Sequence, residues 1–195
     1  RSQVKNITIF GSGNQAYWHL RLALMMRGST VKHVYIINHR FSSSAAAIMK
    51  RFSIIPSHIK EREGWSEAKF AMLKPSFHEF ERLQKEYIRA SDVLYCCTPS
   101  REDLFDASIL TNHEGRKKGR LIVAVGSLMP EMRELPEGLL HLATRNNGNH
   151  SEKPHRHFHK HAEEGGVIVV DSLDGVLRDA GEIISAQVPA THLVE

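Results

Sequence analysis

The chain has 195 residues, of which 41% are hydrophobic and 25% are charged, a composition typical of globular proteins. This length suffices for one well-cored domain, so a single domain over residues 1–195 is expected. The net charge of +4 arises from 26 basic and 22 acidic residues without a periodic basic face, which argues against nucleic-acid binding. No apolar run approaches the roughly 18–20 residues of a membrane-spanning helix, so no membrane association is predicted.

Hydrophobic periodicity predicts strands and helices that alternate along the chain. Strands are expected at Val4–Phe10, His33–Asn38, Phe70–Leu73, Val93–Cys97, Leu121–Val125 and Val167–Val170. Helices are expected at Gln15–Met26, Ser42–Phe52, Phe77–Ala90, Ser100–Leu110 and Leu173–Ala180, with a short element at Leu139–Ala143 and irregular structure over residues 54–68. Such alternation predicts an α/β fold, a doubly wound and mostly parallel Rossmann sheet in three α/β/α layers.

The two cysteines of the chain, Cys96 and Cys97, are adjacent within a predicted strand. Neighbouring side chains of a strand point to opposite faces, so the pair is expected to remain as buried thiols. Reduced thiols are typical of a reducing compartment, and we therefore expect a cytoplasmic protein.

A polar segment at about 146–164 interrupts the alternation and is predicted to be a mobile surface insertion. Histidines at alternate positions of such a segment could bind Zn²⁺ or Ni²⁺ adventitiously, but a specific site needs ligands that a second layer of contacts holds in place. No physiological metal site is therefore predicted from its histidines, which are His150, His155, His157, His159 and His161.

A glycine-rich turn follows the first predicted strand. Its residues are Gly11-Ser12-Gly13-Asn14-Gln15-Ala16, the pattern Gly-x-Gly-x-x-Ala that opens the first helix of a Rossmann unit. In that unit the first glycine makes the tight turn, the second lets the backbone approach a pyrophosphate, and the helix N-terminus holds the phosphates. The pattern predicts a dinucleotide site, although such turns also occur in α/β proteins that bind no nucleotide.

Four segments, in this order, resemble the ornithine cyclodeaminase/mu-crystallin family and span nearly the whole chain. They are Phe10–His19, Asp92–Ser100, Ala124–Ser127 with Pro130–Leu135, and Val169–Ser172 with the following Ala180-Gly181-Glu182.

The resemblance implies that this chain corresponds to the cofactor domain alone. Proteins of the family are homodimers whose substrate and dimerisation region begins before the Rossmann domain, and their substrate-binding Arg and Lys lie there. The chain is thus expected to be a fragment or an excised domain that is inactive by itself, and no catalytic residue is assigned.

Candidate cofactor residues follow the ends of the predicted strands, where open α/β sheets bind ligands. The second strand ends at Asn38-His39-Arg40, which lacks the acid of an NAD-preferring domain and supplies an arginine for a 2′-phosphate, so NADP(H) is favoured over NAD(H). A solvated loop arginine is the alternative reading of Arg40. The resemblance also implies that further residues contact the ribose or pyrophosphate and the nicotinamide ring of the cofactor. These residues are Thr98, Pro99, Ser100, Ala124, Val125, Gly126 and Asp171.

The loop after Gly126 bears on the reaction. Cyclodeaminases of the family place an acid in this loop, whereas this chain has Ser127-Leu128-Met129-Pro130 before its first acid, Glu131. Leucine and methionine transfer no protons, which disfavours ornithine cyclisation. In the intact protein we expect a ketimine reductase or an amino-acid oxidoreductase acting on a small amino or imino acid. A non-catalytic nucleotide-binding protein and a true ornithine cyclodeaminase remain as alternatives.

Overall fold

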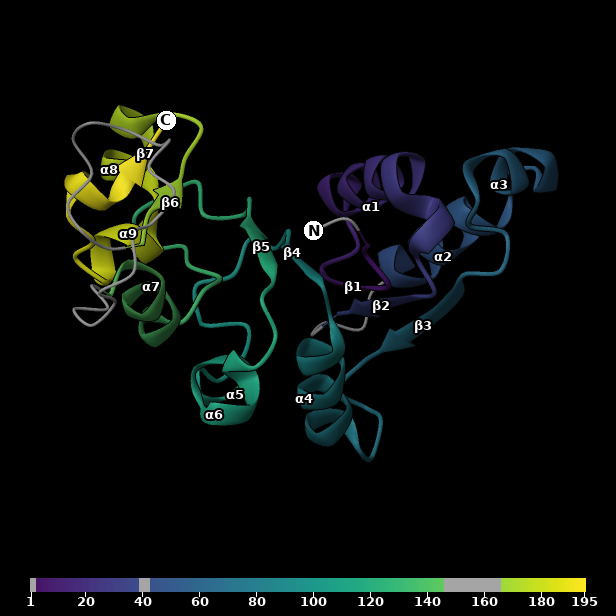
Figure 1. Cartoon of the computed structure of the whole chain (residues 1–195), viewed down its shortest axis with the longest axis horizontal. Coiled ribbons are helices and arrows are strands. Elements are labelled where there is room, and N and C mark those ends of the chain that lie inside the picture. The colour runs from purple at the N-terminus through teal and green to yellow at the C-terminus, as the bar shows by residue number, and fades with distance from the viewer. Residues whose placement is uncertain (1–2, 39–42, 146–165) are drawn as a thin grey trace, which may run out of the picture. The chain divides into compact units, whose positions relative to one another are not determined.

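The computed structural model describes residues 3–38, 43–145 and 166–195. The chain divides into two compact units (Figure 1). Unit 1 comprises Arg1–Thr98 and Asn112–Gly126, and unit 2 comprises Pro99–Thr111 and Ser127–Glu195. The single domain expected from the chain length stays a prediction.

Unit 1 contains a five-stranded sheet in the order β3-β2-β1-β4-β5, and every neighbouring pair of strands is parallel. The order reverses between β1 and β4, which is the switch point at which doubly wound folds bind ligands. The predicted α/β Rossmann-like fold is confirmed. The strands are β1 (Asn6–Phe10), β2 (His33–Ile37), β3 (Lys69–Leu73), β4 (Val93–Cys96) and β5 (Leu121–Ala124).

Helices flank this sheet (Figure 1). Helix α1 contacts β1 and β4, whereas α4 contacts β1 and β3. Right-handed crossovers that leave β1 in one direction and β3 in the other put these helices on opposite faces. The helices of unit 1 are α1 (Asn14–Arg27), η1 (Gly28–Thr30), α2 (Ser43–Ser53), α3 (Ser57–Glu63), α4 (Phe80–Ala90) and α6 (His113–Arg116).

The core of unit 1 forms around β1, which helices cover on both faces. Ile7, Ile9 and Phe10 are completely buried, as expected for a central parallel strand. Leu20 and Leu24 of α1 lie one turn apart and belong to the same core as Ile7 and Ile9. This packing fixes the place where β1 ends and α1 begins.

Helix α3 is a correction to the predicted irregular segment. It extends from Ser57 to Glu63 and buries none of its residues, so it lacks the apolar face that periodicity detects. Its boundaries did carry signals in the sequence, because Pro56 is its N-cap and Gly64 ends it in the left-handed conformation with φ of +80°.

The helix predicted over Ser100–Leu110 is wrong for most of its length, since α5 spans only Ser108–Thr111. The Ser100 hydroxyl donates to the Glu102 carbonyl at 2.7 Å and accepts from the Glu102 N–H at 3.2 Å. Such local bonds compete with a helix. The Asp106 carboxylate then accepts from the Ser108 N–H at 2.6 Å and starts α5.

Unit 2 has its own small core, which comprises Leu140, Ile183, Ala186, Val188 and Leu193. The strand predicted at Val167–Val170 is present as β6, but it pairs in parallel with β7, a strand that was not predicted. The elements of unit 2 are α5, α7 (Glu137–Thr144), β6 (Ile168–Val169), α8 (Leu173–Asp179), α9 (Gly181–Ser185), η2 (Ala190–His192) and β7 (Leu193–Val194).

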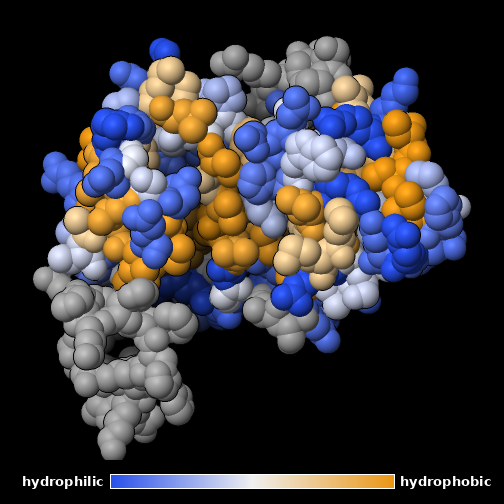
Figure 2. All heavy atoms as spheres, turned by 90° about the horizontal axis from the view of Figure 1, so that it is seen from above, coloured by the Kyte–Doolittle hydropathy of each residue, from blue (hydrophilic) through white to orange (hydrophobic). Residues whose placement is uncertain are grey.

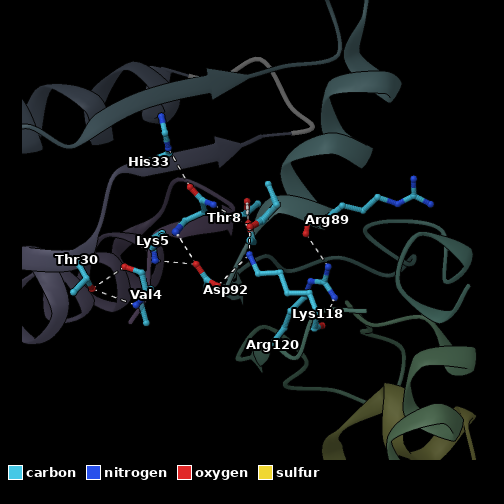
Figure 3. A network of polar contacts seen from close by, with 12 residues as sticks. Val4, Lys5, Thr8, Thr30, His33, Arg89, Asp92, Lys118 and Arg120 are labelled. Carbon is cyan, nitrogen blue, oxygen red and sulfur yellow. Dashed lines mark hydrogen bonds and ion pairs between the residues drawn. The ribbon is translucent and has the colours of Figure 1, made fainter. Parts of the chain in front are cut away.

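An ion pair between the buried Asp92 and the partly buried Lys118 lies where β1 and β4 begin (Figure 3). The Asp92 carboxylate accepts from the N–H groups of Lys5 at 2.8 Å and Asn6 at 3.0 Å, and it lies 3.0 Å from the Lys118 ammonium. Burial alone would raise the pKa of Asp92, but these three groups outweigh it and hold that pKa below its ordinary value. The network joins strand β1 to the segments that precede β4 and β5.

Apolar side chains are also exposed on α1. Trp18, Leu22, Met25 and Met26 are more than half exposed and follow helical spacing, opposite the buried Leu20 and Leu24. Figure 2 shows apolar patches between charged residues on one face of the molecule.

Candidate functional site

Gly11 ends β1 in a backbone conformation that favours glycine, with φ of +102°. A Cβ atom at this position would lie 2.5 Å from the carbonyl oxygen of Cys97, which leaves no space for a side chain. The Gly11 N–H donates to the carbonyl of Ile37 at 2.9 Å. The turn between β1 and α1 therefore fits closely between the ends of β2 and β4.

Gly13 differs from Gly11 because a Cβ atom there would meet nothing within 4 Å. It is the N-cap of α1 and has an extended backbone, so no side chain caps the first N–H groups of the helix. The first turn also contains no acidic residue. An uncapped 14-residue helix with open space in front of it is suited to bind an anion.

Asn38 and Ser12 are brought together across the turn. The Asn38 side-chain amide donates to the Ser12 hydroxyl at 2.9 Å, and the Asn38 backbone N–H donates to the Leu73 carbonyl at 3.0 Å. The residue after β2 is thus held against the middle of the glycine turn. This geometry places the predicted ribose-binding residue beside the predicted phosphate-binding residues.

The other predicted residues of unit 1 lie at the same edge of the sheet. The Cys97 N–H donates to the Phe10 carbonyl, and Thr98 follows it with its methyl group beside Gly11. The Val125 N–H donates to the Cys96 carbonyl at 3.0 Å, which continues the pairing of β4 with β5. Carboxyl ends of β1, β2, β4 and β5 therefore bring together Gly11, Ser12, Gly13, Asn14, Gln15, Asn38, Thr98, Ala124, Val125 and Gly126.

The remaining predicted residues lie outside the described part of unit 1. His39 and Arg40 lie outside the described residues, as does the His-rich segment. Pro99, Ser100 and Asp171 belong to unit 2, where Ser100 makes its local bonds and Asp171 is exposed between β6 and the N-cap of α8. Their predicted contacts with a cofactor stay predictions.

Arg51, on α2, is a candidate that sequence reasoning missed. Its guanidinium donates to the Asn14 side-chain oxygen at 3.0 Å and lies 3.4 Å from the centre of the Tyr17 ring. It therefore adds a positive charge at the first turn of α1. No local pattern marks this arginine, because its contacts lie 34 or more positions away in the chain.

The loop after β5 begins with a polar side chain, that of Ser127. Ser127 accepts a hydrogen bond from the Gly181 N–H at 3.0 Å and donates to the Met132 carbonyl at 2.5 Å. Beside it lies the buried Glu182, whose pKa is raised by burial and by the nearby Glu134. Leu128 and Met129, in contrast, are exposed.

Cys96 is buried, Cys97 is half-buried, and the two form no disulfide. Within residues 3–38, 43–145 and 166–195, no group of three or more His, Cys, Asp or Glu side chains has the geometry of a metal site. In the same ranges, no helix combines the length and the apolar character needed to cross a membrane.

Comparisons with known proteins extend this description. The chain has a TM-score of 0.59 and 16% identity to the iminosuccinate reductase of Paracoccus denitrificans, whose structure contains NAD⁺, with 98% of this chain and 44% of the reductase covered. That likeness shows the fold. The chain is also 23% identical to the uncharacterised protein YGL159W of Saccharomyces cerevisiae, over 97% of this chain and 47% of that protein. No family model matches the chain, and the chain spans less than half the length of either relative.

Proposed function

We propose that this chain binds a nicotinamide dinucleotide, with the pyrophosphate at the N-terminus of α1. The observation that carries the proposal is the contrast between the two glycines of the turn. Gly11 has no space for a side chain, whereas Gly13 opens an uncapped helix end toward solvent. A fold shared with a reductase that holds NAD⁺ supports the same ligand class.

The proposed preference is for NADP(H) over NAD(H). Asn38 lies next to Ser12, at the position where NAD-binding domains place a carboxylate that accepts from the ribose 2′-hydroxyl. An uncharged amide does not repel a 2′-phosphate. The neighbouring Arg40 supplies a cation in the sequence, and phosphate recognition favours arginine.

The Asn38→Asp variant tests this preference. Aspartate can accept from the Ser12 hydroxyl, so the variant retains the local contact while it adds a negative charge. We expect the ratio of NADPH to NADH affinity to fall about tenfold, the effect of about 1.4 kcal/mol of added repulsion. Isothermal titration calorimetry with both cofactors gives the ratio.

Asn14→Asp is the matched control, since it places the same charge at the first turn of α1. It should weaken both cofactors together and leave their ratio unchanged. An Asn38→Asp protein with the wild-type ratio would contradict the proposed role of Asn38.

The reaction class of the intact protein is proposed as hydride transfer at a C=N bond of a small imino acid. Support comes from the loop after β5, where the exposed Leu128 and Met129 stand in place of an acid. In the family that the chain resembles, the substrate residues precede the Rossmann domain and so correspond to none of these 195 residues, which we therefore expect to show no turnover alone. NADPH consumption with cyclic and open imines measures this; turnover by the isolated chain would contradict the proposal.

A non-catalytic nucleotide-binding protein is the second candidate, and the apolar Leu128–Met129 pair favours it as well. Both candidates predict cofactor binding by this chain. An assay on a protein as long as the relatives would distinguish the two candidates. A reductase consumes NADPH when an imine is present, whereas a binding protein does not.

A further inference from the structure

Two buried carboxyl groups, those of Glu134 and Glu182, lie in unit 2. Glu134 is completely buried and Glu182 is 5% exposed. One oxygen of Glu182, Oε2, is buried and has no hydrogen-bond partner among the described residues. An ionised Glu134 disfavours the ionised form of Glu182, and burial removes most of the hydration of the Glu182 carboxylate.

The hydrogen bonds of Ser127 indicate how this arrangement is accommodated. The Met132 carbonyl has no proton, so the Ser127 hydroxyl donates to it, at 2.5 Å. The Gly181 N–H, at 3.0 Å, donates to the Ser127 oxygen. The Glu182 carboxyl also forms a hydrogen bond with Ser127, but its Oε2 atom is buried and has no partner among the described residues. Ionisation would leave negative charge on a buried oxygen without a partner, and a proton on the carboxyl removes that charge.

The charged groups near Glu182 lie on the loop and the helices packed around it. On the loop Ser127–Glu134, the like-charged Glu134 raises the pKa of Glu182 and Arg133 pairs with Asp103, while the remaining polar side chain of helix α9 is Ser185. Charged side chains of the adjoining α7 and α8 pair with each other at the surface, as Glu137 with His141 and Arg178 with Asp179.

We infer that Glu182 holds a proton at pH values where exposed glutamates are ionised, and that this neutral carboxyl positions the loop Ser127–Glu134 on α9. The loop and the helix meet closely, since a Cβ atom at Gly181 would lie 2.0 Å from the Met132 carbonyl oxygen. Ser127 directly follows Gly126 at the end of the β5 segment. Glu182 is therefore a positioning residue for the loop that leaves the sheet edge.

The sign of the pH effect follows from the direction of the pKa. A carboxyl whose pKa is raised on folding binds its proton more tightly in the folded state, so its stabilising effect is complete below the ordinary glutamate pKa and is lost as the pH rises toward the raised value. One proton changes the folding equilibrium constant by at most about tenfold per pH unit.

Titration of the wild-type chain tests the inference directly. With carbon-13-labelled glutamate, NMR of the side-chain carboxyl carbons should show the Glu182 signal titrating at higher pH than glutamate in a short unstructured peptide. Glu182→Gln assigns the signal. A Glu182 signal that titrates together with the peptide, or below it, would overturn the inference.

Amide hydrogen exchange of Gly181 gives a second, local measurement. After correction for the intrinsic pH dependence of exchange, protection of this amide should fall with rising pH in the wild type and in Glu131→Gln. In Glu182→Gln, whose neutral amide can still donate to Ser127, the protection should stay constant. Ser127→Ala should lose it at every pH. Wild-type protection that does not change as Glu182 ionises would contradict the positioning role.

Discussion

At the scale of single residues, the two glycines of the turn meet different structural constraints. Gly11 is required by its positive φ and by the Cys97 carbonyl, whereas Gly13 has neither constraint. The pattern Gly-x-Gly predicted both positions, but the different physical demands on them became visible only in the packed turn.

Gly11→Ala should therefore destabilise unit 1. A left-handed conformation costs an alanine about 1–2 kcal/mol, and the contact at 2.5 Å with backbone adds to it, so we expect a loss of at least about 2 kcal/mol. Both tryptophans, Trp18 and Trp65, belong to unit 1, so urea unfolding followed by tryptophan fluorescence reports on this unit.

Gly119→Ala is the control, because a Cβ atom there also meets nothing within 4 Å. Its free energy of unfolding should stay within about 1 kcal/mol of wild type. Equal stability of Gly11→Ala and Gly119→Ala would show that the turn tolerates a side chain.

At the scale of elements, the end of the sheet opposite the glycine turn contains the ion pair of Asp92 and Lys118. Asp92 links β1 to the start of β4 through two N–H groups and the Lys118 ammonium (Figure 3). Its pKa is lowered on folding, so its stabilising effect is present above the ordinary aspartate pKa and is lost as the pH falls through the lowered value.

Asp92→Asn should cost about 2–3 kcal/mol at neutral pH, because it leaves a partly buried ammonium without its charged partner. The difference from wild type should shrink as the pH falls toward 3. Urea unfolding over this pH range, followed by tryptophan fluorescence, measures both effects. Glu67→Gln, which removes an exposed charge in the same unit, is the control and should leave the free energy of unfolding unchanged. If the difference in this free energy between Asp92→Asn and wild type were the same at every pH, the stabilising role of the Asp92 charge would be refuted.

Elements with an apolar face were predictable from the sequence, and elements without one were not. The buried strands β1, β2 and β4 and the helices α1 and α4 follow hydrophobic periodicity. Helix α3 buries none of its residues, so periodicity does not reveal it. The segment after Ser100 has apolar residues, but local hydrogen bonds there compete with the helical hydrogen bonds. Pairing of β6 with β7 depends on residues some 25 positions apart, which no local pattern encodes.

At the scale of the whole molecule, the chain spans less than half the length of the relatives that it matches. The segments Phe10–His19 and Asp92–Ser100 were predicted to meet at one edge of the sheet, and in unit 1 Gly11 lies against Cys97 and Thr98. Long-range partners such as Arg51 with Asn14, or Glu182 with Ser127, arise from packing between distant segments and left no signal in the sequence.

Binding of NADPH by the wild-type chain and by Gly13→Ala tests the central claim most directly. A methyl group at position 13 meets no protein atom within 4 Å, so the variant should unfold like the wild type. The same methyl group would occupy the space that we propose for the pyrophosphate in front of α1. Isothermal titration calorimetry should show NADPH binding to the wild type, more tightly than NADH, and at least about tenfold weaker binding to Gly13→Ala, a loss of about 1.4 kcal/mol or more. Absence of binding by the wild type at millimolar cofactor, or equal affinity in both proteins, would contradict the account.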